Sequence, residues 1–396
     1  MLSPSQILFS LILVNLFAWS VAFANFLFFF RRRKIKETVF SPRVSILKIF
    51  YGVEEGLAEN LESFTRIDYP HYELILSVLD GDDPAIPLLK RFMDNHPHCP
   101  IKLVVRPSQL GPNRQVCNFY NAFLEASGEI LVLSDSDTIA TPDYIRQLIK
   151  PLEDRRVGLV SAVPLMVGAR GWAGYANTLT YNLMIPLVDV LFQYLTPVGI
   201  GPAMAFRREA YLKTGGFKAI ARKLTTDQEL AKLFALAGYK TRVAPYLIRT
   251  HERNQGIIGH AGHTLRWMVA VRVASPVAYH FFILTCQSLF ALLLLFLEPG
   301  SPYSWGMLLM VIAYRTVMPS FLDRVIYRQG IPFLYFFSVL IADLLFPFVW
   351  LAGYFQRTVV WGKYRFVVEN GIVRAEEISE TGNLEGEVRV NPGYVP

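Results

Sequence analysis

Apolar stretches at both ends of the chain enclose a central region in which short apolar runs alternate with polar segments. Residues 3–30 carry no charge, which is enough for one membrane helix of roughly 20 residues. Three further apolar blocks follow the central region, at residues 276–297, 303–322 and 331–354. This pattern predicts a membrane protein with an N-terminal anchor over residues 1–33 and two to three membrane helices over residues 275–355.

The central region, residues 41–270, has the pattern of an α/β domain. Short apolar runs predict buried strands, as at residues 44–47, 74–79 and 130–133. Segments whose apolar residues recur every three or four positions separate them and predict helices. Alternating strands and helices with short loops are typical of a mostly parallel, Rossmann-like sheet. The last segment, residues 356–396, predicts short strands that give way to an acidic, weakly ordered end.

Residues 172–206 form an unusual apolar segment inside the predicted α/β domain. Asp189 is its one charged residue before Arg207, and several aromatic residues accompany it. Proline and glycine interrupt it, and polar sequence lies on both sides. A membrane crossing here would split the domain across the bilayer. We therefore expect amphipathic helices that lie in the membrane interface and form the region where an acceptor enters.

Basic residues follow the first apolar stretch directly, at Arg31, Arg32, Arg33, Lys34 and Lys36. A signal peptide has its positive charges before the apolar run, which is the reverse order. Because cytosolic flanks of membrane helices carry an excess of Lys and Arg, we expect an uncleaved anchor whose N-terminus lies outside. The α/β domain is then cytosolic, in a bacterial inner membrane or an equivalent one.

The overall charge agrees with a membrane partner. The chain has 39 Lys and Arg against 32 Asp and Glu, a net charge of +7, and much of the excess lies beside apolar segments. Anionic lipid headgroups account for that placement. No basic stripe interleaved with exposed aromatic residues occurs, so the expected partner is a lipid bilayer and no nucleic acid.

The three C-terminal apolar blocks raise a question of parity. Three full crossings would place the tail outside, whereas the basic residues Arg357, Lys363, Arg365 and Arg374 favour the cytosolic side. One block is therefore expected to be re-entrant or interfacial. Arg315 makes the block at residues 303–322 the least ordinary span, because charges inside the membrane are rare.

Two acidic clusters follow predicted strands. Asp135 and Asp137 come after the run at residues 130–133, and Asp80 follows the run at residues 74–79. Ligands of open α/β sheets lie beyond the carboxyl ends of the strands, so the two clusters open on the same rim. Paired carboxylates suit a Mg²⁺ or Mn²⁺ ion that also takes phosphate oxygens from a nucleotide. The alternative is a solvated acidic turn that caps the next helix.

Short pieces spread over residues 42–267, together with the flanking membrane segments, resemble a known family. In this order and spacing they are similar to membrane glycosyltransferases with a GT-A fold, close to the ceramide glucosyltransferases. Bacterial enzymes that glycosylate hopanoids and other lipids are also similar. The main pieces are Asp80, Gly111-Pro112-Asn113, Asp135-Ser136-Asp137, Asp227 and Arg266-Trp267.

The resemblance implies roles for the reacting groups. Asp135 and Asp137 would bind the divalent cation and the diphosphate of a UDP-sugar. Asp227 would be the general base that takes the proton from the acceptor hydroxyl. Arg266 would neutralise charge on the leaving UDP, and Trp267 would line the acceptor pocket. In isolation, Asp227 also suits a helix first turn, and the Arg266-Trp267 pair also suits a membrane-interface anchor.

Further nucleotide-sugar contacts follow from the same resemblance, at Lys48, Asp80, Asn113, Arg114 and His263. Asp80 would contact the uridine. Three positions depart from the family pattern. His263 stands where Gln or Arg is usual, Ile49 stands where Pro is frequent, and Arg114-Gln115 replaces a common Pro-Lys.

The expected function is inverting transfer of a sugar, most simply glucose, from a UDP-sugar to the hydroxyl of a ceramide-like membrane lipid. One alternative is a UDP-N-acetylhexosamine or other UDP-sugar transferase that acts on a hopanoid or glycerolipid. A processive polysaccharide synthase would be expected to carry Gln at the His263 position and more spans. A non-catalytic membrane scaffold with a degenerate nucleotide pocket is the alternative from a different class.

Overall fold

The computed structural model describes residues 2–31, 40–108, 110–361, 364–369, 372–378 and 384–387. The basic residues at 32–36 and Lys363, which carried the orientation and parity arguments, lie outside these ranges. The chain divides into two compact units. The membrane unit comprises Met1–Arg33, Leu165–Leu191 and Glu252–Gln356. The sheet unit comprises Lys34–Pro164, Phe192–His251 and Arg357–Pro396.

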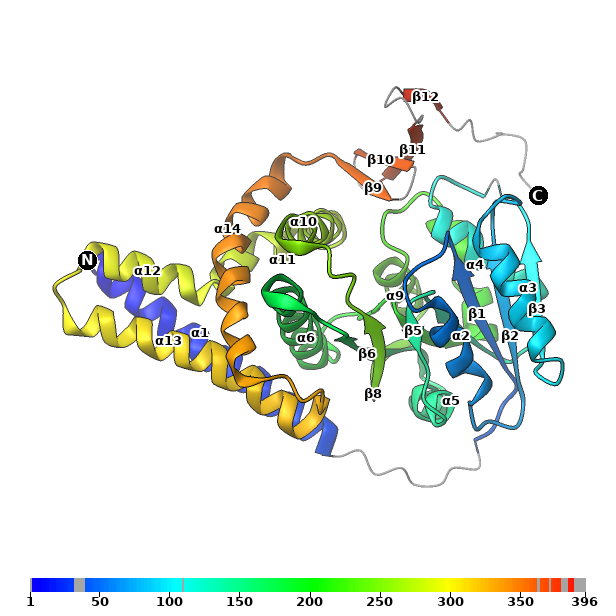
Figure 1. The fold of residues 1–396 in the computed structure, drawn as a ribbon, viewed down its shortest axis with the longest axis horizontal. Helices are drawn as coiled ribbons and strands as arrows, with labels where there is room; N and C mark the ends of the chain where they lie inside the picture. The colour runs from blue at the N-terminus through cyan, green and yellow to red at the C-terminus, as the bar shows by residue number, and fades with distance from the viewer. Residues whose placement is uncertain are drawn as a thin grey trace. The chain divides into compact units, whose positions relative to one another are not determined.

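An eight-stranded mixed sheet is the centre of the sheet unit (Figure 1), in the order β3-β2-β1-β4-β7-β6-β8-β5. The first four strands in this order are parallel, at β3 (Ile101–Val105), β2 (Tyr72–Val78), β1 (Val44–Phe50) and β4 (Ile130–Ser134). The others are β7 (Ala203–Arg207), β6 (Val157–Val167), β8 (Lys240–His251) and β5 (Thr138–Ile139). β7 runs antiparallel to β4 and β6, and β5 antiparallel to β8. The predicted α/β class with a Rossmann-like parallel portion is confirmed.

Both faces of the parallel strands are covered, as their continuous apolar runs predicted. Ile46 and Val132 point into one apolar cluster, while Leu47 and Leu131 point into the other. On the first face lie α2 (Leu57–Thr65), α3 (Ala85–Asn95) and α5 (Tyr144–Ile149). On the second lie α4 (Arg114–Glu125), α7 (Arg208–Lys213), α8 (Gly216–Ile220) and α9 (Asp227–Leu236). Every residue of β1 and β4 is buried.

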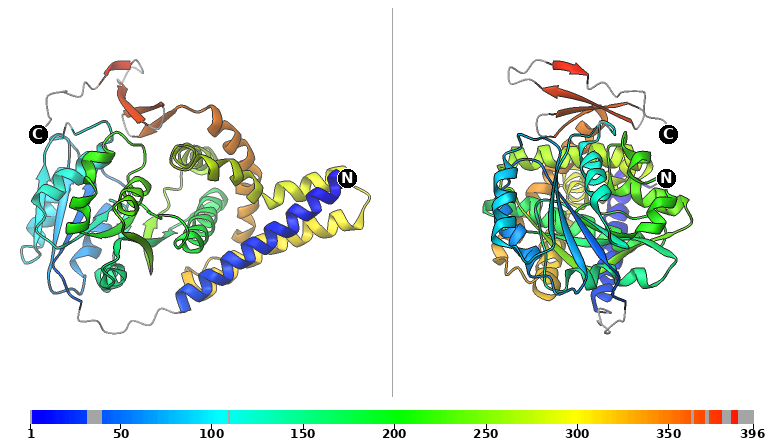
Figure 2. Two further views of the ribbon diagram at one scale, coloured as in Figure 1. Left: turned by 180° about the vertical axis from the view of Figure 1, so that it is seen from behind. Right: turned by 90° about the vertical axis from the view of Figure 1, so that its right-hand side faces the viewer.

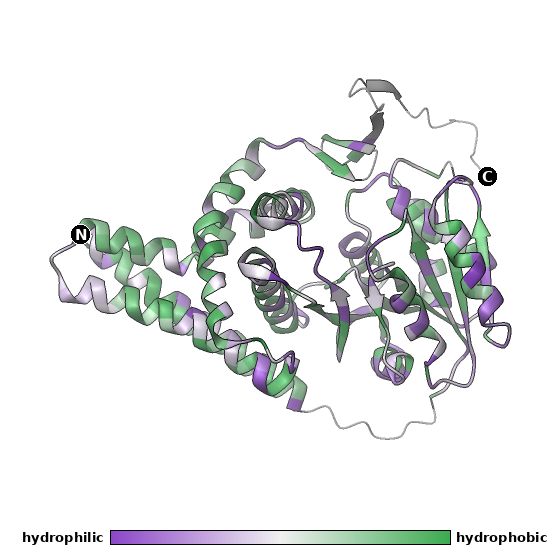
Figure 3. Cartoon of the chain, in the orientation of Figure 1, coloured by the Kyte–Doolittle hydropathy of each residue, from purple (hydrophilic) through white to green (hydrophobic). Residues whose placement is uncertain are grey.

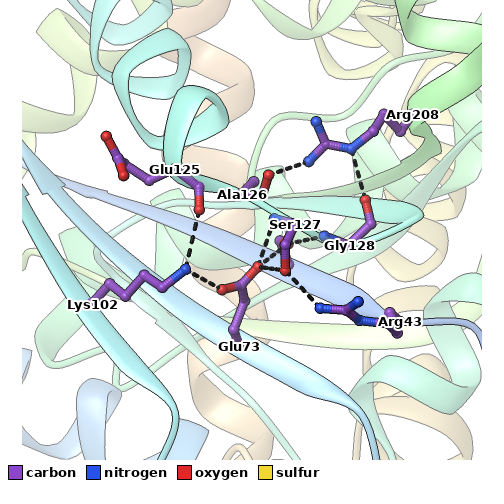
Figure 4. Close-up of polar contacts among 9 residues, drawn as sticks. Arg43, Glu73, Lys102, Glu125, Ala126, Ser127, Gly128 and Arg208 are labelled. Carbon is purple, nitrogen blue, oxygen red and sulfur yellow. Dashed lines mark hydrogen bonds and ion pairs between the residues drawn. The ribbon is translucent and has the colours of Figure 1, made fainter.

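A polar network closes the amino end of the parallel strands (Figure 4). Glu73 at the start of β2 accepts hydrogen bonds at 2.7 Å from the hydroxyls of Ser45 and Ser127, and it forms an ion pair of 2.8 Å with Lys102. Burial alone would raise the pKa of Glu73, but these donors lower it to about 2. Arg208 adds hydrogen bonds to the carbonyls of residues 126 and 128. The network therefore stabilises the rim opposite the acidic clusters.

The expected interfacial segment at residues 172–206 divides into two kinds of structure. Its first part is one helix, α6 (Gly171–Phe192), and its last part is the buried strand β7. The prediction of helices was therefore wrong for β7. A short apolar run such as Ala203–Phe206 does not separate strand from helix by periodicity, and its partners β4 and β6 are remote in sequence.

The tail forms a small antiparallel sheet in the order β12-β11-β10-β9. Its strands are β9 (Thr358–Trp361), β10 (Tyr364–Glu369), β11 (Ile372–Ile378) and β12 (Leu384–Glu387). The backbone N–H of Val373 donates to the carbonyl of Arg222 at 2.9 Å. The short strands predicted for the tail are present, and β11 is attached to the segment that precedes α9.

The membrane unit is helical and strongly apolar (Figure 3), with α6 and six further helices. They are α1 (Pro4–Arg31), α10 (Gly256–Ala274), α11 (Pro276–Phe282), α12 (Gln287–Leu297), α13 (Pro302–Leu322) and α14 (Val339–Phe355). Within the described ranges, three segments are long and apolar enough to cross a membrane, at Pro4–Arg31, Pro302–Tyr327 and Phe333–Phe355. The segments Pro276–Thr285 and Gln287–Leu297 form a fourth candidate, bent by 51°. One N-terminal and two C-terminal candidate spans agree with the prediction.

The irregular C-terminal block is residues 276–297, and Arg315 lies in an unbroken helix. Its guanidinium is buried and donates to Asp343 of α14 at 2.8 Å, and Asp343 also accepts from Ser288 at 2.5 Å. Because this ion pair satisfies the charge of Arg315, α13 continues through it. The sequence singled out this block because a charge inside the membrane is rare, and the structure pairs that charge with Asp343 of the next helix.

Candidate active site

Lys48 of β1 fixes the acidic loop that follows β4, residues 135–138, by hydrogen bonds. Its side chain is fully buried, and the amino group donates to the carbonyl of Asp135 at 2.6 Å and to the hydroxyl of Thr138 at 3.0 Å. Burial lowers the pKa of Lys48 to about 7, although the negative charges of Asp137 and Asp135 oppose the shift. The geometry gives Lys48 a role in fixing this loop; its predicted contact with nucleotide stays a prediction.

Other side chains fix the same loop. The amide of Asn60 donates to the carbonyl of Ser136 at 3.3 Å, and the hydroxyl of Ser136 donates to Glu54 at 2.6 Å. The hydroxyl of Thr138 donates to the carbonyl of Asp135 at 2.8 Å. A loop held at Asp135, Ser136 and Thr138 presents its carboxylates in a preorganised position, as a binding site requires.

Asp135 and Asp227 converge on the same space beside Gly201. A methyl group placed on Gly201 would lie 3.3 Å from one carboxylate oxygen of Asp227 and 3.9 Å from one of Asp135. Asp227 is the first residue of the helix α9, whereas Asp135 directly follows the strand β4, so the two aspartates come from elements that are far apart in sequence. The structure therefore brings together the predicted metal ligand and the predicted base.

The electrostatics of this space favour a bound cation. Burial, and then the negative charge of Asp137, raise the pKa of Asp135 well above its usual range, while Lys48 opposes the shift. Burial also raises the pKa of Asp227, despite hydrogen bonds from the backbone of Gln228 and Gly201. Carboxylates that repel one another in a poorly solvated place are costly unless a positive charge joins them.

A divalent cation fits this arrangement. Carboxylate oxygens are the ligands that Mg²⁺ and Mn²⁺ accept, and the absent side chain of Gly201 leaves room between Asp135 and Asp227. Within the described ranges, no group of three or more His, Cys, Asp and Glu side chains is placed to hold a metal ion by itself. An ion bound by Asp135 and Asp137 would therefore complete its coordination with water and substrate oxygens, as Mg²⁺ commonly does.

The first turn of α4 connects the loops of this rim. Asn113 accepts from the backbone N–H of Val116 at 3.1 Å and caps the helix. Its amide group donates to the carbonyl of Lys223 at 2.8 Å. Arg114 donates to both carboxylate oxygens of Asp80 at 2.6 Å. Asp80 and Arg114, both predicted to contact nucleotide, are thus paired with one another, and Asn113 fixes the segment before α9.

Gln115 links Asp135 to Thr226, and no role was predicted for it. Its amide nitrogen donates to Asp135 at 3.2 Å, and its amide oxygen accepts from the hydroxyl of Thr226 at 2.6 Å. Thr226 directly precedes Asp227. The one signal in the sequence was that Gln115 stands where the related family has Lys.

The remaining predicted residues lie on α10 in the membrane unit. The ring of Trp267 packs against Tyr181 of α6, with centroids 4.9 Å apart, and against His263, with centroids 4.2 Å apart. Burial and the charges of Arg266 and Arg253 lower the pKa of His263 to about 3. His263 is therefore neutral near pH 7, and any hydrogen bond it gives to a phosphate comes from a neutral ring.

His260 belongs to a buried polar chain between α6 and α10. Its Nδ1 donates to the amide oxygen of Asn177 at 2.8 Å, and the amide nitrogen of Asn177 donates to Glu252 at 2.5 Å. These contacts and its burial give His260 a structural role in the core of the membrane unit. The sheet unit gathers the predicted metal, nucleotide and base residues, and the membrane unit gathers His263, Arg266 and Trp267.

Together, the mixed sheet, the acidic set on its rim and the apolar helices define a membrane glycosyltransferase with a GT-A fold. The chain belongs to glycosyl transferase family 21, whose family model matches residues 7–373. Ceramide glucosyltransferase 3 of Caenorhabditis elegans is 24% identical over 245 residues, which are 61% of this chain and 53% of that protein. Ceramide glucosyltransferase 1 of the same organism is 22% identical over 354 residues, 86% of this chain and 74% of that protein.

The chain thus matches about half the length of the first relative and about three quarters of the second. Among solved structures, a mannosyltransferase from Pyrobaculum calidifontis in complex with GDP-Man and Mn²⁺ is 18% identical. Its superposition gives a TM-score of 0.49 and covers 84% of this chain and 99% of that one.

Proposed function

We propose that this protein transfers a sugar, most simply glucose, from a UDP-sugar to the hydroxyl group of a ceramide-like membrane lipid. Membership of glycosyl transferase family 21 and the two ceramide glucosyltransferase relatives support the reaction class and the acceptor. The single observation that carries the proposal is the approach of Asp135 and Asp227 to the same space beside Gly201.

The sheet unit supplies the donor half of the reaction. Asp135 and Asp137 would hold Mg²⁺ or Mn²⁺, which when bound balances the negative charge of the diphosphate. The loop that carries them is fixed by Lys48 and Asn60, so the diphosphate is received without rearrangement of the loop. Asp80 and Arg114 are predicted to contact the nucleotide, and we place them at the uridine end.

Asp227 acts as the general base. It removes the proton from the acceptor hydroxyl, the freed oxygen forms a bond to the anomeric carbon, and the bond from that carbon to UDP breaks. UDP leaves with the electron pair, and Arg266 balances its charge. One displacement inverts the configuration at the anomeric carbon. Because burial raises the pKa of Asp227, its carboxylate is a stronger base than an exposed aspartate.

Replacement of Asp227 tests the proposal. Asp227→Asn keeps the size and most hydrogen bonds of the side chain but removes the base, which typically costs a factor of about 10² to 10⁴ in rate. Metal-dependent UDP binding should remain. Glu229→Gln in the same helical turn is the matched control, because Glu229 pairs with Lys232 at 2.7 Å and is given no role in the reaction. Undiminished turnover by Asp227→Asn would exclude Asp227 as the base.

A further inference from the structure

The helices α1 and α13 run side by side in the same direction through the membrane unit (Figure 2). Their contacts advance together along both helices. Ile12 shares an apolar cluster with Val311, Ser20 bonds Tyr314 at 3.1 Å, and the rings of Phe23 and Phe26 meet Phe321 and Tyr327. The beginning of α13 therefore lies at the N-terminal end of α1, and residue 327 lies near Arg31.

The bent pair α11–α12 leads to the N-terminal end of α1. Phe290 and Leu294 of α12 belong to the same apolar cluster as Ile12. Since α12 ends at Leu297 and α13 begins at Pro302, the turn between them lies at that end. The bent pair thus runs from the end of α10 toward the N-terminal end of α1, and α13 runs back along α1.

Along α14 from its start to its end, the contacted helices come in the reverse of their chain order: α12, then α11, then α10. Asp343 bonds Ser288 at the start of α12, and the indole N–H of Trp350 donates to the carbonyl of Tyr279 in α11 at 2.9 Å. Finally, Arg272 at the end of α10 donates to the carbonyl of Gln356 at 2.6 Å. Along its length, α14 therefore leads away from the turn between α12 and α13 and back toward α10.

Both ends of α14 lie at the end of the membrane unit opposite the turn between α12 and α13. Its start follows α13, which ends near Arg31, and from Arg31 only eight residues, 32–39, precede Phe40 in the sheet unit. Its end leads into β9 of the tail sheet, which is bonded to the sheet unit through Val373 and Arg222.

One face of α14 is apolar and exposed. Leu344, Phe348, Leu351 and Phe355 are exposed by 52%, 73%, 52% and 77%, at spacings that place them on one stripe. The opposite face packs inside the unit through Val339, Ala342, Phe346, Val349 and Gly353. Water is a poor neighbour for such a stripe, and the crossing helices α12 and α13 beside it place bilayer lipid there.

We propose that α14, although long and apolar enough to span, does not cross the membrane. It lies within the leaflet at the Arg31 end of α1, with the stripe from Leu344 to Phe355 against the acyl chains. The C-terminal part then has two crossings, α11–α12 and α13, and Arg357 lies on the same side as Arg31. A methyl group on Gly353 would lie 3.3 Å from Met268, the neighbour of Trp267. The buried face of α14 therefore packs against α10, the helix that carries the predicted acceptor residue Trp267.

Labelling from each side of sealed, oriented vesicles tests the crossing number. Three variants of the full chain each carry Cys99→Ser and one added cysteine, at Gly300, Arg324 or Arg357. The Cys99→Ser chain without an added cysteine gives the background labelling of the buried Cys117 and Cys286. A membrane-impermeant maleimide should label positions 324 and 357 from one side and position 300 from the other. Labelling of position 357 together with position 300 would mean that α14 crosses, and would overturn the proposal.

Depth measurement gives an independent readout. Nitroxide labels at Leu344 and Phe355 should report similar depths in lipid vesicles, whereas a spanning helix would separate these positions by about 16 Å along the membrane normal. Labels at Leu309 and Val317 of α13 are the matched control, because both are exposed in a crossing helix and should differ by about 12 Å. A difference of about 16 Å in depth between the labels at Leu344 and Phe355 would overturn the proposal. Neither experiment measures sugar transfer, so the proposal about α14 is tested separately from the proposed function.

Discussion

Removal of the Gln115 bridge should slow sugar transfer while the fold persists. Gln115→Met keeps the shape of the side chain but removes the hydrogen bond to Asp135 and the acceptor for Thr226. A hydrogen bond to a charged group contributes about 1.5–3 kcal/mol and a neutral one about 1 kcal/mol. If about 2–3 kcal/mol of this total is lost from the transition state, kcat falls by a factor of about 30 to 150.

Two charged variants separate the ends of the bridge. Gln115→Glu keeps an oxygen for Thr226 but places a further negative charge beside Asp135. Gln115→Lys keeps a donor to Asp135 but offers no acceptor to Thr226. Since the bridge acts by joining its two ends, both variants should lower kcat. Full activity of Gln115→Lys would show that only the donor to Asp135 matters.

The assay is UDP release at saturating UDP-sugar, with the melting temperature as a check on folding. Glu125→Gln at the far end of α4 is the control, because Glu125 pairs with Arg106 on the surface. The double variant Gln115→Met with Thr226→Val should be no slower than Gln115→Met alone, since both changes remove one connection. The bridge would be refuted if the fall in kcat of the double variant equalled the product of the falls in the two single variants. A kcat of Gln115→Met within twofold of the unsubstituted chain would also refute it.

Three further changes address stability and the metal site. Glu73→Gln should destabilise the chain by about 2 kcal/mol, seen as a lower melting temperature. Because the pKa of Glu73 in the folded chain, about 2, lies below the ordinary 4.5, its stabilising contribution is present above pH 4.5 and is lost as the pH falls toward 2. An unchanged melting temperature of Glu73→Gln at pH 7 would contradict this contribution. Gly201→Ala puts a methyl group 3.3 Å from Asp227 and should raise the metal concentration needed for half-maximal UDP binding about tenfold; unchanged metal dependence would contradict the site. Asp343→Asn leaves Arg315 unpaired and should cost about 3–5 kcal/mol, with recovery of the melting temperature when Arg315→Met is added; a double variant as unstable as the single one would contradict a simple ion pair.

The parts of the fold that the sequence predicts are those set by local pattern. The buried run at residues 130–133 ends in Asp135 and Asp137, so the strand and its acidic loop are recognisable together. The anchor at residues 3–30 is recognisable because length and absence of charge suffice. β7 was not predicted, because an apolar run of five residues acquires its identity only from the strands beside it.

The contacts of individual side chains could be predicted from the sequence less well than the helices and strands. Gln115 acquires its place from Asp135 and Thr226, which are 20 and 111 residues away in the chain. The neutral state of His263 follows from burial and from the charges of Arg266 and Arg253. Arg315 stood out as an unusual charge because Asp343, which pairs with it, lies 28 residues away in the next helix. Such pairings come from packing between remote elements, which periodicity along the chain does not encode.

The most direct test of the central claim is UDP release by the detergent-purified full chain given UDP-glucose. Ceramide, a hopanoid and no lipid are compared, each with and without EDTA. The proposed function predicts release that is stimulated by ceramide alone and abolished by EDTA. Stimulation by the hopanoid alone, or release that persists in EDTA, would contradict the proposed acceptor or the proposed metal.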